Sequence, residues 1–255
     1  MEYLEDAIVA AKLAGKYLRE MYKNGNVSAE YKSANEIVTS ADKGAEKIIL
    51  DYLKSKYPRH KFISEESKPT ENESEFVWYI DPLDGTTNFF YRIPYFNVSI
   101  ALEHKKHGFV GVVYDPINDD LFFAVKGQGA YLNGKKIKPN DNSNLKHAFI
   151  TSCHGKSDEQ IKTFLELMSK FKREAKDMRK LGSAALELCS VACGRTDAFI
   201  GYGTKPWDVK AGLLIARESG CVLSGVFDDE MGSEDVLVTS PKLYEQIKNV
   251  IKEKK

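Results

Sequence analysis

The chain has 255 residues, 37 basic and 37 acidic side chains, and a formal net charge of zero. That length allows one or two domains with a cleft between them. The balanced charge argues against a general nucleic-acid or membrane-surface binder, because such proteins carry a basic excess. Hydrophobic residues make up 42% of the chain and charged residues 29%, which excludes a disordered or fibrous class.

Cysteine use and hydropathy suggest a soluble protein of a reducing compartment. None of the four cysteines forms a C-x-x-C pair, and we expect Cys189 and Cys193 to be core residues. The N-terminus is acidic where a signal peptide is basic. No apolar run approaches the roughly 18 residues that span a bilayer. We therefore expect a cytoplasmic protein with no membrane and no nucleic-acid partner.

The first half of the chain is predicted to be two helices on a mostly antiparallel sheet. Apolar residues at helical spacing predict one helix ending near Asn24-Gly25 and a second starting near Ser40 and stopping before Pro58. Asn133-Gly134 is a strong hairpin signal. The strands expected in this half are 61–64, 76–80, 97–103, 109–114, 121–125, 129–132 and 135–138.

The second half, beyond the turn-rich segment Pro139–Asn144, alternates strands and helices. Such alternation is typical of a layered α/β arrangement. We expect Ser240 to cap the last helix and Pro241 to occupy its first position. The strands expected are 148–151, 197–200, 221–223 and 236–239, and the helices are 158–171, 183–193 and 208–219.

The segment Tyr79–Phe89 carries the clearest chemical pattern. A buried strand delivers Asp81, Pro82 forces a turn, Asp84 follows, and Gly85 lets the backbone approach a ligand closely. Paired carboxylates attract hard cations such as Mg²⁺, and the N–H groups of a helix start attract phosphate. A phosphate bridged to a metal satisfies both. The alternative is a plain strand–turn–helix junction capped by an aspartate.

Three distant segments supply further acids. Glu65 and Glu66 directly follow a strand, Asp208 opens a helix after Pro206-Trp207, and Asp42 lies in the first turn of the second helix. Each has an ordinary alternative as a solvated loop residue or as an acid that complements a helix dipole. Composition and spacing alone do not show that these segments lie close together in the fold.

Taken together, these segments resemble the inositol monophosphatase family of metal-dependent, lithium-inhibited phosphatases. The resemblance covers nearly the whole chain, in order. It implies a five-layer αβαβα sandwich of the inositol monophosphatase/fructose-1,6-bisphosphatase type, with an N-terminal half (1–142) and a C-terminal half (143–255) in one compact unit. The matching motifs are Glu65–Ser67, Trp78–Phe89, Pro94–Ile100, Gly111–Pro116, Gly127–Gly134, Gly182–Ala185, Trp207–Gly212 and Glu218–Gly220.

The resemblance also implies roles for individual residues. Two to three Mg²⁺ ions would be held by Glu65, Asp81, the carbonyl of Leu83, Asp84 and Asp208. The Gly85 and Thr86 amides would bind phosphate, and Asp84 and Asp208 would also contact the substrate. Thr86, oriented by Asp42, would help activate water, with Glu65 as a further catalytic residue. Gly182, Ser183 and Ala184 would line the polyol side of the cleft.

The implied function is a Mg²⁺-dependent phosphomonoesterase, acting on inositol 1-phosphate and in some relatives on fructose 1,6-bisphosphate. In animal relatives an acid seven positions before the Trp-Asp aspartate binds inositol hydroxyls, but here that position is Gly201. This leaves the substrate open, and a 3′-phosphoadenosine 5′-phosphate (nucleotide) phosphatase is the alternative. The resemblance further implies a homodimer and leaves lithium sensitivity open.

A few residues have undecided roles. Lys32 resembles a lysine on the family's mobile metal-site loop, which would fall in residues 25–36. Lys205, Tyr202 and Arg179 are candidates to meet a second phosphate. Glu187 is interpreted as an ordinary helix-face residue, and the five histidines as surface or structural residues outside the motifs. A non-catalytic regulator is a further possibility, which loss of one acid would favour, and no acid is missing.

Overall fold

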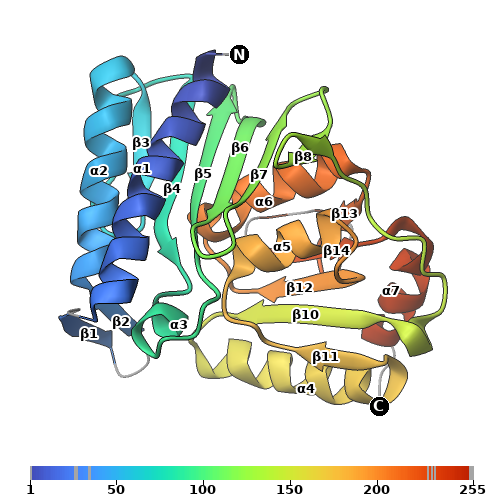
Figure 1. Cartoon of the computed structure of the whole chain (residues 1–255). Helices are drawn as coiled ribbons and strands as arrows, with labels where there is room; N and C mark the ends of the chain where they lie inside the picture. Colours follow the sequence, from blue (N-terminus) through green and yellow to red (C-terminus); the bar gives the residue numbers. More distant parts are fainter. Residues whose placement is uncertain are drawn as a thin grey trace.

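The computed structural model describes residues 2–25, 28–33, 36–228, 230, 232 and 234–252. Its helices and sheets stack as five alternating layers (Figure 1). Three apolar clusters fill the spaces between these layers, so each sheet has a helix layer packed on both faces. The predicted αβαβα sandwich is therefore confirmed.

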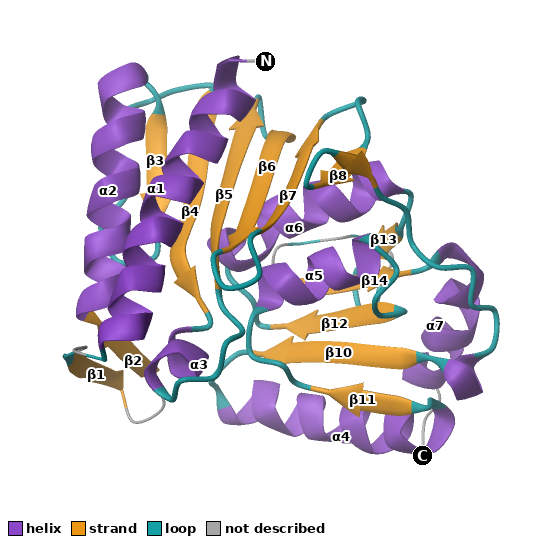
Figure 2. Ribbon diagram, in the orientation of Figure 1, coloured by secondary structure: helices purple, strands orange, loops and turns teal. Residues whose placement is uncertain are grey.

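The first helical layer consists of α1 (Glu2–Asn24) and α2 (Ser40–Lys56), which cover one face of a seven-stranded sheet (Figure 2). A stripe of buried alanines on α1 lets the two helices approach closely. The first two strands of this sheet run parallel and the others antiparallel. In spatial order they are β3 (Lys61–Ser64), β4 (Phe76–Asp84), β5 (Asn97–His104), β6 (His107–Asp115), β7 (Asp120–Val125), β8 (Ala130–Leu132) and β9 (Lys135–Lys136).

The central layer contains α5 (Ala184–Ala192) and α6 (Pro206–Ser219), which pack between the two sheets. Every residue of α5 is buried, as expected for a helix covered on all sides. Glycines permit the close contacts: a Cβ at Gly111 would lie 2.8 Å from the carbonyl oxygen of Ala211, and one at Gly212 would lie 2.7 Å from Leu188. This layer ties the two predicted halves into one core.

The second sheet has five strands, and α4 (Asp158–Glu174) and α7 (Tyr244–Lys252) cover its outer face. In spatial order its strands are β11 (Asp177–Arg179), β10 (Phe149–His154), β12 (Ala198–Tyr202), β14 (Asp235–Thr239) and β13 (Val222–Ser224). The boundary proposed near residue 142 lies between β9 and the short 3₁₀ helix Leu145–His147. Division into halves 1–142 and 143–255 stays a prediction.

Two local expectations were wrong, and one strand was missed. The segment 25–36 was taken as a loop, but β1 (Ala29–Ser33) and β2 (Glu36–Thr39) form an antiparallel hairpin. The three-residue strand β11 is too short to show a periodic signal. Pro241 opens a 3₁₀ turn, and α7 begins only at Tyr244. The helix start expected after Gly85 is confirmed, since α3 spans Thr86–Phe90.

All four cysteines are free thiols, and Cys189 is fully buried, as expected of a core residue. Among the helices of the described ranges, none combines the length and the apolar character that a membrane crossing requires.

Candidate functional site

Parallel pairing brings Glu65 beside Asp81. In the register of β3 and β4, Ser64 lies opposite Ile80, so the next residues on the two strands are neighbours. The Glu65 backbone N–H donates to the Ile80 carbonyl at 3.2 Å, which extends this pairing past the end of β3. The strand register, rather than any local motif, therefore places the two carboxylates together.

A β-bulge in β4 changes the side of the sheet to which the Asp84 side chain points. Asp81 pairs with Ser99 and Asp84 with Asn97, so three steps along β4 correspond to two along β5. In a regular strand, residues three apart face opposite sides of the sheet. One extra residue, beside the Pro82 ring that lacks an N–H donor, restores both aspartates to the same side. The Leu83 N–H then donates to Asp81 Oδ1 at 3.0 Å.

Asp84 joins the two halves of the chain. Its Oδ2 accepts hydrogen bonds from Ser183 Oγ at 2.7 Å, the Ala185 N–H at 2.8 Å and Asn97 Nδ2 at 2.9 Å. Its Oδ1 accepts a longer bond of 3.3 Å from the Ala184 N–H. The carboxylate thus holds the start of α5 against the end of β4.

Asp208 lies in the first turn of α6, behind a proline at the first helical position. Its Oδ2 accepts the Lys205 backbone N–H at 2.8 Å, so the side chain does cap its own helix. The same carboxylate also lines the cavity described below. Burial raises its pKa to about 7, with a further contribution from the charge of Asp84. Asp208 therefore both caps α6 and lines the cavity.

These acids destabilise one another's charged forms. The pKa of Asp81 is raised well above its ordinary value, first by burial and then by the charges of Glu65, Asp84 and Asp208. Burial also raises the pKa of Asp84, although its four hydrogen bonds oppose the shift. Within the described ranges, no three His, Cys, Asp or Glu side chains stand close enough together to cage an ion as they are.

The residues nevertheless fit a hard divalent cation. A buried aspartate and the three carboxylates that interact with it electrostatically are an oxygen-rich donor set of the kind that Mg²⁺ takes. Among the described residues, Asp81 accepts a hydrogen bond through Oδ1 alone, and Asp208 accepts one through Oδ2 alone. A cation would relieve the repulsion that raises the pKa values of these groups.

Thr86 and Asp42 form a separate unit on the α2 side. Thr86 Oγ1 lies 2.8 Å from Asp42 Oδ1 and 3.0 Å from the Leu83 carbonyl oxygen, and its hydroxyl donates to these acceptors. Asp42 Oδ2 accepts from the Thr39 N–H at 2.8 Å and from Thr39 Oγ1 at 2.5 Å. Burial raises the pKa of Asp42. The Asp42 carboxylate is thereby held behind Thr86 and does not itself line the cavity.

Gly85 forms the turn between Asp84 and Thr86. Its φ of +98° lies in the left-handed region, and a Cβ there would come within 2.9 Å of the Tyr95 carbonyl oxygen. Glycine is therefore required on two independent grounds.

These groups line a cavity of about 890 Å³ between the two halves of the chain. Of the residues predicted for the site, the structure places on its wall Glu65, Asp81, Leu83, Asp84, Gly85, Thr86, Gly182, Ala184 and Asp208. Asp42 and Ser183 stand behind this wall, bonded to Thr86 and Asp84. Other wall residues bring cations and an amide, and they are Lys156, Gln160, Lys180 and Lys205; His154 lies among them.

The fold and this acid-lined cavity agree with a comparison of the chain against known families. The model of the inositol monophosphatase family matches residues 1–254. The chain belongs to this family, whose members are metal-dependent phosphatases.

Relatives within the family carry different names. The chain is similar to Nus factor SuhB of Escherichia coli, with 41% identity over 239 residues that cover 92% of this chain and 88% of the relative. It is similar to inositol monophosphatase 3 of Solanum lycopersicum, with 40% identity over 242 residues that cover 91% and 88%. A solved structure of an inositol monophosphatase-fructose 1,6 bisphosphatase superposes with a TM-score of 0.84 at 28% identity, covering 98% and 100%.

The candidates for a second anion contact are partly wrong. Arg179 does not line the cavity, because its Nε donates to Asp177 Oδ2 at 2.8 Å on the outer side. Tyr202 packs edge-on against Phe227 and does not line it either. Lys205 does line it. Lys32 lies in β1, and its side chain falls outside the described part of the structure.

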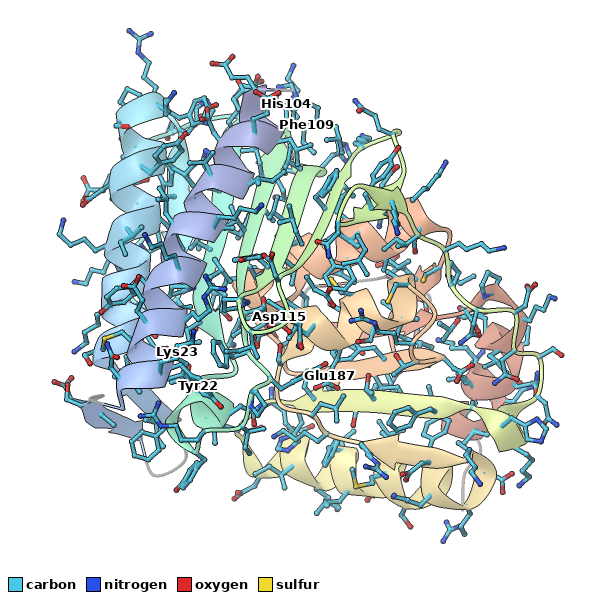
Figure 3. All side chains as sticks on the ribbon, viewed as in Figure 1. Tyr22, Lys23, His104, Phe109, Asp115 and Glu187 are labelled. Carbon is cyan, nitrogen blue, oxygen red and sulfur yellow. The ribbon has the colours of Figure 1, made fainter. Side chains whose placement is uncertain are left out.

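One further sequence interpretation was wrong, and one histidine lies on the cavity wall. Glu187 is not a surface helix residue but is fully buried between the sheets (Figure 3). Its Oε1 accepts the backbone N–H groups of Leu181, Gly182 and Ser183 at 3.0–3.4 Å. His154 lies on the cavity wall, with Nε2 at 3.1 Å from Lys180 Nζ. Neither residue stands in a motif, so only its packing shows its place.

Proposed function

We propose that this protein is a Mg²⁺-dependent phosphomonoesterase that releases phosphate from a small polyol or sugar phosphate. The observation that carries the proposal is the convergence of Glu65, Asp81, Asp84 and Asp208, whose mutual repulsion calls for a cation. Bound Mg²⁺ would supply Lewis-acid stabilisation and lower the pKa of a bound water. We propose the carboxylates and the Leu83 carbonyl as its ligands, and two to three ions as its number.

Backbone and side-chain groups of this chain would then bind and orient the substrate and the attacking water. We propose that the Gly85 and Thr86 amides hold the phosphate oxygens at the start of α3. Because Thr86 Oγ1 donates to Asp42 Oδ1, its lone pairs are left to accept a hydrogen bond from a water in the cavity. A proton taken up at Oγ1 would be matched by transfer of the hydroxyl proton to Asp42, whose raised pKa favours acceptance.

We propose inositol 1-phosphate as the first substrate to test. The name of the Solanum lycopersicum relative supports this choice. Fructose 1,6-bisphosphate is a second, because a structural neighbour carries that activity in its name and the far wall of the cavity is rich in lysine. A nucleotide phosphatase acting on 3′-phosphoadenosine 5′-phosphate remains the alternative within the same chemistry.

The Escherichia coli relative is named a Nus factor, and a non-catalytic role is the other candidate for this chain. For this chain, retention of all five acids favours catalysis, since a binding role would not require Asp42 behind Thr86.

The test is phosphate release from each of the three substrates with Mg²⁺ and after its removal by a chelator. Asp84→Asn should lower turnover about 100-fold or more, because an amide cannot neutralise a cation. Asp51→Asn, on the exposed side of α2, is the matched control and should leave turnover unchanged. Thermal melts of both variants would show that the fold is kept. Turnover that survives the chelator would contradict the proposed mechanism.

We also propose a homodimer in the cytoplasm. Tyr91 and Ile93, which are 63% and 49% exposed beyond α3, support an interface there, and the four free thiols support a reducing compartment. Light scattering at micromolar concentration tests the assembly.

A further inference from the structure

Gly201 stands two residues before Gly203, which lines the cavity, and it offers a leaving group no side chain. Gly201 lies in β12 between β10 and β14. A Cβ there would come within 2.8 Å of Val236 Cγ2, 2.9 Å of Phe199 Cε1 and 3.0 Å of Thr204 Cγ2. No side chain fits at position 201 without displacing these neighbours, so a contact to the leaving group at this end of the cavity would come from another residue.

The carboxamide of Gln160 occupies a slot made by two other glycines. A Cβ at Gly155 would lie 2.1 Å from Gln160 Oε1, and one at Gly203 would lie 2.3 Å from Gln160 Nε2. Gly203 also has a φ of +78°, which disfavours other residues. All three residues line the same cavity as Asp208. The two glycines therefore admit the Gln160 side chain to the cavity wall.

The capping box of α4 fixes which end of this carboxamide is the donor. Oε1 accepts the Ser157 backbone N–H at 3.1 Å, and Ser157 Oγ accepts the Gln160 N–H at 3.2 Å. Since Oε1 is held by an N–H, the remaining end must be the NH₂ group. Across the described residues, no acceptor is paired with Nε2.

From this geometry we propose that Gln160 is a specificity-determining residue that donates a hydrogen bond from Nε2 to an oxygen of the leaving group. The inference depends on the proposed phosphomonoesterase function and adds the side chain that contacts the alcohol. The neighbouring wall residues Lys156, Lys180 and Lys205 are cations. This end of the cavity therefore selects a leaving group rich in acceptor oxygens.

The experiment compares Gln160→Leu and Gln160→Glu with the wild-type protein on three substrates. These are inositol 1-phosphate, fructose 1,6-bisphosphate and phenyl phosphate, whose leaving group has no further oxygen. Removing one neutral hydrogen bond should lower kcat/KM of Gln160→Leu about 3- to 10-fold on the first two substrates. The value on phenyl phosphate should stay within about twofold, because phenol offers Nε2 no second oxygen.

Gln160→Glu keeps the shape and the bond to Ser157 but replaces the donor by a charged acceptor. It should lower kcat/KM for fructose 1,6-bisphosphate about 10-fold or more, through repulsion of the second phosphate. Inositol hydroxyls can donate to a carboxylate, so that substrate should stay within about threefold. Ser157→Ala is the control, because it weakens the α4 cap while leaving the backbone N–H that holds Oε1.

An equal loss on all three substrates in both variants, or a similar loss in Ser157→Ala, would show that Gln160 acts through the stability of α4 and would overturn the inference. No loss in either variant would overturn it too. Absence of wild-type turnover on every substrate is a different result, since it would contradict the proposed function itself.

Discussion

Replacing Glu187 by glutamine tests whether a carboxyl group enclosed between the two sheets stays protonated at neutral pH. Glu187 is fully buried, and burial raises its pKa to about 8, although three backbone N–H groups on Oε1 oppose the shift. No described group is bonded to Oε2. Glutamine is the isosteric mimic of the protonated acid, because its oxygen can accept the same N–H groups.

The expected magnitude follows from proton linkage. Between the ordinary pKa of 4.5 and the folded-state value of about 8, folded Glu187 keeps a proton that the unfolded chain releases. The free energy of unfolding of the wild-type protein therefore falls as pH rises through this window, by at most about 1.4 kcal/mol per pH unit. The Glu187→Gln variant has no carboxyl proton at this position, so its free energy of unfolding lacks this decrease. From pH 5.5 to 7.5 its stability relative to wild type should rise by about 2–3 kcal/mol.

The assay is urea unfolding of both proteins at pH 5.5, 6.5 and 7.5 in a chelator. Other titrating groups, such as Asp208, are present in both proteins and largely cancel in the difference. Glu166→Gln changes the same functional group on the exposed face of α4 and reports the effect of losing a surface carboxyl. A repeat with Mg²⁺ shows how far a cation near Asp84 alters the result.

A difference between Glu187→Gln and wild type that stays constant from pH 5.5 to 7.5 would refute the reasoning. It would mean that Glu187 is ionised in the folded protein and that the three N–H groups outweigh its burial. Loss of stability in the variant at pH 7.5 would lead to the same conclusion.

Two further predictions concern activity. Thr86→Val and Asp42→Asn should each lower kcat about 100-fold. The double variant should be no worse than either alone, because both residues act through the bond from Thr86 Oγ1 to Asp42 Oδ1. Additive losses of kcat in steady-state kinetics would contradict this. Lys180→Gln should lower kcat/KM for fructose 1,6-bisphosphate about 3- to 10-fold and leave inositol 1-phosphate within about twofold, since one exposed cation is removed from the cavity wall. Arg179→Gln, one residue away but paired with Asp177, is its control, and an equal effect would show that the lysine does not contact the second anion.

The acids of the site could be predicted from the sequence because each stands at a boundary with its own local signal. Asp81 and Asp84 lie in the last four residues of the apolar strand β4, and Asp208 follows a proline at a helix start. Helix and strand periodicity depend on short-range spacing, so the layers were predictable in outline. The hairpin β1–β2 and strand β11 were not, because these short strands stand among polar and turn-forming residues typical of loops.

The sequence by itself determined which residue types this protein has available: five acids, a glycine turn between Asp84 and Thr86, and a glycine at position 201. Only the tertiary structure decided how they are used. The parallel register of β3 and β4 sets Glu65 beside Asp81, the β4 bulge turns Asp84 to the same side, and Gly155 and Gly203 leave room for Gln160. Register and packing depend on contacts between residues up to about a hundred positions apart, and no local pattern encodes these.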